Sequence, residues 1–167
     1  MAYFPMCIDL RGKRILLVGQ GRQITDKAEK LRPFGGELYR VGTLTEGDLT
    51  EEVALVVIGD TPEPLAEQYS RLCRMHRIPV NVVDMPRLCT FCFPSIISRG
   101  ALTIAISTGG AVPVVGAHLK RRVEEQLPAD VETILQELQD LRQTLYQQYP
   151  KETARTMLRD AIEKALE

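Results

Sequence analysis

Residues 18–31, VGQGRQITDKAEKL, follow an apolar run and place Gly19 and Gly21 at the spacing of the dinucleotide-binding pattern G-x-G-x-x-G. In that pattern the first glycine permits a tight strand-to-helix turn, and the second lets the backbone approach a pyrophosphate. The third glycine position holds Ile24 instead. The stretch therefore predicts a nucleotide-type turn that is altered at its end, and the alternative is a tight turn that binds nothing.

The sequence around this turn predicts alternating strands and helices. Four short segments are expected to be strands: 14–18, 37–41, 54–58 and 78–83. The segments 14–18 and 54–58 are apolar runs, as strands buried on both faces are. Two segments between them have the composition of helices: 25–32 and 61–76. Because strands that alternate with helices usually form a parallel sheet covered on both faces, we predict an α/β fold with a Rossmann-like parallel sheet.

The pattern changes after residue 84. Residues 95–98 and 102–107 flank Arg99 and Gly100 as the strands of a hairpin do. Residues 130–146 carry an apolar residue at every third or fourth position, which predicts a long amphipathic helix, and a last helix is expected over 151–166. The apolar stripe of the long helix fits either the core of one chain or an interface between chains.

Composition narrows the class of protein. The net charge of -1 argues against a nucleic-acid binder, which usually has a basic excess. The sequence has no apolar run long enough for a membrane span, and its first residues lack the apolar region of a secretion signal. The four cysteines are expected to be cytosolic thiols rather than a disulfide framework, so we predict a cytoplasmic protein.

Asp84 ends the run at 78–83, where ligands of open α/β sheets bind beyond the carboxyl ends of the strands. A carboxylate there is placed for general base catalysis, and equally for a turn before Pro86. The acidic residue that usually holds the ribose is missing after the second strand. Arg40 stands nearby, either as a contact for the 2′-phosphate of NADP or as a solvated surface residue.

Three further motifs each allow both a functional and a structural interpretation. Cys89 and Cys92 form a C-x-x-C pair that suits a redox couple or half a metal site, although two structural thiols are the better interpretation. Thr108, Gly109 and Gly110 follow an apolar strand and predict either an anion-binding turn or a plain one. The basic run at 120–122 is interpreted as one solvated helix face that could also meet substrate carboxylates.

Several stretches together resemble the precorrin-2 dehydrogenase and siroheme synthase N-terminal domain family. They are YFP at 3–5, DLRGKRILLVGQG at 9–21, NVVDMPRLCTFCFPSII at 81–97 and LTIAISTGGAVP at 102–113. The resemblance implies a dinucleotide-binding domain over 1–84, a central dimerisation region over 85–112 and a helical C-terminal region over 113–167. It also implies a homodimer that oxidises precorrin-2 to sirohydrochlorin with NAD as hydride acceptor, and some family members insert iron as well.

The same resemblance assigns residues to roles. Asp84 matches the family's key carboxylate, which is expected to be catalytic. Cofactor contacts are expected at eight positions: Gly19, Gly21, Arg22, Gln23, Thr43, Leu44, Gly59 and Asp60. Substrate contacts are expected at four: Asn81, Thr108, Gly109 and Gly110. No metal site is expected.

The turn departs from the family pattern V-G-G-G-x-[VI]-[AG]-x-R-K. Gln20, Ile24 and Asp26 replace a glycine, a small residue and an arginine. Ile24 adds bulk where the helix packs against the strand or the phosphate, and Asp26 is expected to bring negative charge into the first helical turn, where it would repel a pyrophosphate. Two hypotheses follow. In the first, the protein is an NAD-dependent precorrin-2 dehydrogenase. In the second, it is a non-redox relative with weak or no NAD binding, which binds tetrapyrrole or acts only as a chelatase or accessory protein.

Overall fold

The structure is a computed structural model of the chain that describes residues 3–166. The chain divides into two compact units, Met1–Phe93 and Pro94–Glu167. Each unit is described by itself. The division expected from the sequence, at residues 84 and 112, stays a prediction.

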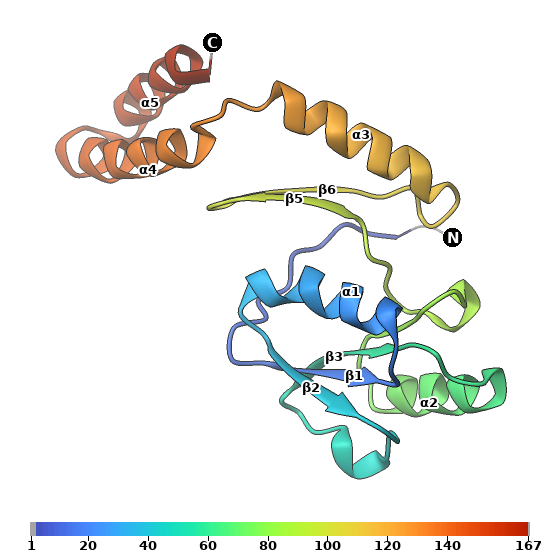
Figure 1. Cartoon of the computed structure of the whole chain (residues 1–167). Coiled ribbons are helices and arrows are strands. Elements are labelled where there is room, and N and C mark those ends of the chain that lie inside the picture. Colours follow the sequence, from blue (N-terminus) through green and yellow to red (C-terminus); the bar gives the residue numbers. More distant parts are fainter. Residues whose placement is uncertain (1–2, 167) are drawn as a thin grey trace. The chain divides into compact units, whose positions relative to one another are not determined.

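The first unit is built on a four-stranded parallel sheet with the strand order β2-β1-β3-β4 (Figure 1). Its strands are β1 (Arg14–Val18), β2 (Glu37–Val41), β3 (Val53–Ile58) and β4 (Val80–Val82). Its helices are α1 (Arg22–Leu31) and α2 (Glu63–Met75), with short 3₁₀ helices at Arg32–Phe34, Glu46–Asp48 and Pro86–Leu88. The α/β class and the Rossmann-like parallel sheet predicted from the sequence are confirmed.

The two helices cover opposite faces of this sheet because side chains alternate along each strand. Ile15 and Leu17 of β1 pack with Ile24 and Ala28 of α1. The intervening β1 residues Leu16 and Val18 belong to the other core cluster, which contains the buried α2 residues Ala66, Tyr69 and Cys73. Burial on both faces explains why β1 and β3 are almost entirely apolar, whereas β2, at the edge of the sheet, is mixed in sequence and largely exposed.

The second unit begins with an antiparallel hairpin of β5 (Ser95–Arg99) and β6 (Leu102–Ile106), as the sequence predicts. Helix α3 (Pro113–Gln126) packs on this hairpin, and α4 (Val131–Gln148) packs against α5 (Lys151–Leu166) (Figure 1). Of the apolar stripe on α4, Val131 and Leu145 are buried, and the residues between them are only partly covered. None of the helices in residues 3–166 combines the length and apolar character needed to cross a membrane.

Candidate functional site

A cavity of about 700 Å³ lies at the carboxyl edge of the parallel sheet. Its wall is made by the turn after β1 together with the ends of β3 and β4 and the residues that follow them: Gln20, Gly21, Arg22, Gln23, Ile58, Gly59, Asp60, Thr61, Pro62, Val82, Val83, Asp84 and Met85. This is the edge at which open α/β sheets bind their ligands. Six of the residues predicted as site residues therefore meet here.

The turn after β1 requires glycine at two positions. Gly19 has φ 92°, and a Cβ on it would lie 2.0 Å from the carbonyl oxygen of Gly59. Gly21 has φ 93°, but a Cβ on it would meet only ordinary contacts with Asp60, at 3.6 Å or more. Gly19 is thus needed for the close approach of two backbones, whereas Gly21 is needed for its left-handed backbone conformation.

Helix α1 begins directly after Gly21, three residues earlier than the sequence predicts, and no side chain caps it. The first backbone hydrogen bond of the helix runs from Thr25 N–H to the Gly21 carbonyl, at 3.4 Å. Within the described residues, the N–H groups of Arg22, Gln23 and Ile24 have no hydrogen-bond acceptor. A glycine turn that leads into open helical N–H groups beside a cavity fits the pyrophosphate of a dinucleotide.

Ile24 points away from this cavity. Its side chain is fully buried in the core between α1 and the sheet. A Cβ on Gly59 would lie 2.7 Å from Cγ1 of Ile24, so the isoleucine occupies the space beside this second glycine. The side chain of Ile24 was expected to add bulk either where the helix packs on the strand or beside the phosphate. In the structure it lies where α1 packs on the sheet.

The expected position of Asp26 in the first helical turn is wrong. Because α1 begins at Arg22, Asp26 lies in the second turn, and the first turn holds no acidic residue. The Asp26 carboxylate is 4.0 Å from Nε of Arg22, a pair in which both side chains are largely exposed. The charge that was expected to repel a pyrophosphate therefore lies one turn further along the helix and next to a cation.

Asp84 follows β4 in a left-handed backbone conformation with φ 61°. The N–H of the preceding residue, Val83, donates to the Ile58 carbonyl at 2.8 Å and keeps this end of β4 against β3. Nε2 of Gln23 donates a hydrogen bond to Oδ2 of Asp84 at 2.7 Å. Asp60, at the end of the neighbouring strand, also has positive φ, at 47°. Strained backbone at non-glycine residues often marks functional sites.

Lys27 lies near this carboxylate and was not singled out by sequence reasoning. It is half-buried, and its Nζ lies 4.4 Å from the centroid of the Phe93 ring. Burial lowers the pKa of Lys27, and the positive charge of Lys30 lowers it further. The negative charge of Asp84 has the largest effect in the opposite direction. Its spacing of four residues from Gln23, which puts both on one side of α1, is the signal that could have found it.

The segment after Asp84 is held by buried contacts. The N–H of Val82 donates to Sγ of Cys89 at 3.2 Å, and burial raises the pKa of the Cys89 thiol. A buried thiol of raised pKa is a weak nucleophile, which agrees with the structural interpretation of Cys89. Nδ2 of Asn81 donates to the Phe91 carbonyl at 3.0 Å. Asn81 therefore has a structural contact, and its role in substrate binding stays a prediction.

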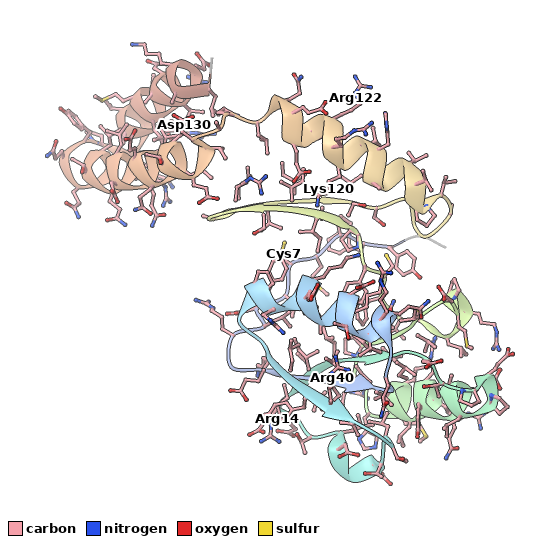
Figure 2. The ribbon with its side chains drawn as sticks, in the orientation of Figure 1. Cys7, Arg14, Arg40, Lys120, Arg122 and Asp130 are labelled. Carbon is pink, nitrogen blue, oxygen red and sulfur yellow. The ribbon has the colours of Figure 1, made fainter. Side chains whose placement is uncertain are left out.

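The other predicted cofactor residues of the first unit lie outside the cavity wall. Thr43 is exposed, and Leu44 is buried in the core cluster on the α2 side. Arg40 extends from β2 and donates from its guanidinium to Oγ1 of Thr25 on α1, at 3.0 Å (Figure 2). The roles predicted for Thr43 and Leu44 stay predictions, and Arg40 is placed beside the start of α1.

In the second unit, the predicted substrate residues form the turn that leads into α3. Oγ1 of Thr108 accepts a hydrogen bond from Val112 N–H at 3.3 Å, and Gly109 and Gly110 have φ of 63° and 84°. The basic run on α3 does not form one face, because successive helical residues are about 100° apart. Lys120 and Arg122 extend from different sides of α3 (Figure 2).

Comparisons with known protein families match both units. A family model described as "Putative NAD(P)-binding" matches residues 37–95, and one described as "Sirohaem biosynthesis protein central" matches residues 99–126. The first match begins after the glycine turn, so the departures at Gln20 and Ile24 lie outside it.

Comparisons with individual proteins agree with these families. A siroheme synthase of Azotobacter vinelandii is 35% identical over 149 residues, which cover 77% of this chain and 32% of that protein. One of Methylococcus capsulatus is 30% identical over 175 residues, which cover 93% of this chain and 37% of that protein. The chain thus spans about a third of the length of the curated relatives it matches. A solved structure described as "SirC, precorrin-2 dehydrogenase" shares the fold, with a TM-score of 0.73, 19% identity and coverage of 98% of this chain and 92% of that one.

We expect Ile24→Ala to destabilise the protein without tightening nucleotide binding. The substitution leaves a cavity beside Gly59 in the core, and such a change costs about 2–5 kcal/mol. The free energy of unfolding in urea measures this loss, and calorimetric titration with NAD measures the affinity. Ala28→Gly, one turn further along the same buried face, is the control for helix packing. A tighter complex with NAD in Ile24→Ala would contradict the placement of Ile24 outside the binding site.

Proposed function

We propose that the chain belongs to the precorrin-2 dehydrogenase and siroheme synthase N-terminal domain family, which both family models and the siroheme synthases support, and that it oxidises precorrin-2 to sirohydrochlorin with NAD as the hydride acceptor. The observation that carries the proposal is the cavity that joins the open start of α1 to Asp84. The candidate cofactor site and the candidate base thus line the same cavity. A dehydrogenation requires both to lie close to the reacting atoms of the substrate.

On the cofactor side, the chain supplies a cradle of backbone groups. NAD, when bound, accepts the hydride that leaves the substrate. The free N–H groups of Arg22 and Gln23 receive the pyrophosphate, whose charge also suits the positive end of the α1 dipole. Gly59 and Asp60 line the same cavity. Thr43 and Leu44 are assigned to the same cofactor by the family resemblance.

On the substrate side, Asp84 takes up the proton that is lost when the hydride leaves. Loss of a hydride and a proton together amounts to the removal of two hydrogen atoms from the substrate, and the Asp84 carboxylate would hold the proton. We assign Asn81, Thr108, Gly109 and Gly110 to substrate binding. Precorrin-2 is rich in carboxylates, and the backbone N–H groups of the glycine-rich turn suit them.

The test is an absorption spectrum of the purified protein incubated with precorrin-2 and NAD. We expect the sirohydrochlorin spectrum to appear together with NADH, and titration calorimetry to detect NAD binding at micromolar concentration. NADP is titrated in parallel because Arg40 lies beside the start of α1. If neither nucleotide binds, the proposal fails, and the non-redox relative that binds tetrapyrrole, or acts only as a chelatase, becomes the function to test.

We expect Asp84→Asn to lower the rate of precorrin-2 oxidation by about 10²-fold or more, the usual contribution of a general base. The amide cannot take up the proton, but it keeps the size of the side chain. NAD affinity should stay at the wild-type value because the glycine turn is unaltered. Asp140→Asn on α4 is the matched control, since Asp140 also accepts a hydrogen bond from a glutamine. An unchanged rate in Asp84→Asn would reduce Asp84 to a turn residue.

We also propose that the protein is a cytoplasmic homodimer. Exposed apolar side chains on α3 and α5, such as Val114 and Met157, support an interface in the second unit. No disulfide joins the four cysteines in residues 3–166, which agrees with a reducing compartment. Light scattering at micromolar concentration should give twice the chain mass of 18.7 kDa. A monomer under these conditions would refute the dimer.

A further inference from the structure

Gln23 connects the cofactor turn to the candidate base. We propose that its side-chain amide is a positioning group that orients Asp84 for proton transfer, while its backbone N–H faces the nucleotide. The hydrogen bond from Nε2 to Oδ2 measures 2.7 Å and joins residues 61 positions apart in the sequence. This inference rests on the proposed function, because it assigns Gln23 a part in that reaction.

Asp84 needs such a partner because little else fixes its side chain. The residue is exposed, and it follows a strand of only three residues. Among the described residues, Gln23 alone donates a hydrogen bond to the carboxylate of Asp84. That bond is to Oδ2, and Oδ1 accepts none. One oxygen is thus held, and the other remains available to a proton from the substrate.

The chemical nature of the donor matters for a base. A neutral amide orients the carboxylate without bringing a positive charge into hydrogen-bond contact, as an arginine or lysine would. A direct ion pair would favour the charged carboxylate and make it a weaker base. The nearest cation described above, Lys27, instead has its ammonium group over the Phe93 ring. Gln23 therefore fixes geometry and leaves the capacity to accept a proton.

The position of Gln23 in the fold couples the two halves of the reaction. It is the second residue of α1, so its N–H belongs to the open first turn. Its side chain bonds to Asp84, so one residue contacts both the open start of the helix and the candidate base.

Nuclear magnetic resonance tests the contact without cofactor or substrate. At neutral pH the side-chain amide protons of Gln23 should lie downfield of those of a solvent-exposed glutamine, because a charged carboxylate is a strong hydrogen-bond acceptor. They should move upfield in Asp84→Ala, which removes the acceptor. Gln23 amide signals that are the same in the wild type and in Asp84→Ala would overturn the inference.

Steady-state kinetics test the role in the reaction. Gln23→Met keeps the length and helix propensity of the side chain but removes the donor. We expect kcat for precorrin-2 oxidation to fall roughly tenfold, the rate equivalent of one hydrogen bond to a charged group. KM for NAD should stay within about twofold, since the backbone N–H remains. Gln23→Glu, which faces Asp84 with a like charge, should lose more.

The matched control is Gln136→Met on α4, which breaks another exposed Gln–Asp hydrogen bond, of 3.2 Å, to Asp140. It should leave kcat unchanged. A wild-type kcat in Gln23→Met would overturn the positioning role while the proposed function stands. If the wild-type protein does not oxidise precorrin-2, the proposed function fails, and the role of Gln23 in that reaction fails with it, even where the resonance measurement confirms the contact.

Discussion

The candidate site depends on the close approach of two backbones, at Gly19 and Gly59. Strands β1 and β3 are neighbours in parallel register, with Val18 opposite Ile58, so the loops that follow them leave the sheet side by side. A side chain on Gly19 would collide with the Gly59 carbonyl, which would lie 2.0 Å from its Cβ. Because these loops can touch, the start of α1 and the residues after β3 line the same cavity. The pairing of two strands thereby determines where a nucleotide could bind.

Ile24 also packs against Gly59, on the side of this glycine that faces α1. The isoleucine fills the space that a side chain on Gly59 would take, with Cγ1 only 2.7 Å from the position of that missing Cβ. A small residue of the family pattern has been exchanged for a large one, and the helix still packs on the sheet because the large side chain faces a glycine. Such an exchange keeps the core filled. The departure from the pattern is therefore a change of packing, while the N–H groups that would meet a phosphate are left open.

Local pattern was enough to predict the central strands β1 and β3, because burial on both faces makes them almost continuously apolar. The last helix, α5, has the predicted bounds, and Gly19, Gly21 and Asp84 were singled out from spacing alone. The start of α1 was placed three residues late, and this error put Asp26 in the wrong turn. Pattern could not show the bond between Gln23 and Asp84, because it depends on where the start of α1 lies relative to the residue that follows β4. Contacts between elements follow from the packing of the whole unit, which periodicity does not encode.

Asp84 is held from both faces of the sheet, and this explains how an exposed residue keeps a left-handed backbone. That conformation costs an aspartate about 1–3 kcal/mol and persists only where the surroundings fix it. On the α2 side, Oγ of Ser70 donates to the Leu88 carbonyl at 2.7 Å, and the buried Sγ of Cys89 accepts from Val82. These bonds fix the backbone before and after Asp84. On the α1 side, Gln23 fixes the carboxylate itself. Backbone and side chain are thus constrained by different helices, so a shift of either helix relative to the sheet would reorient the carboxylate.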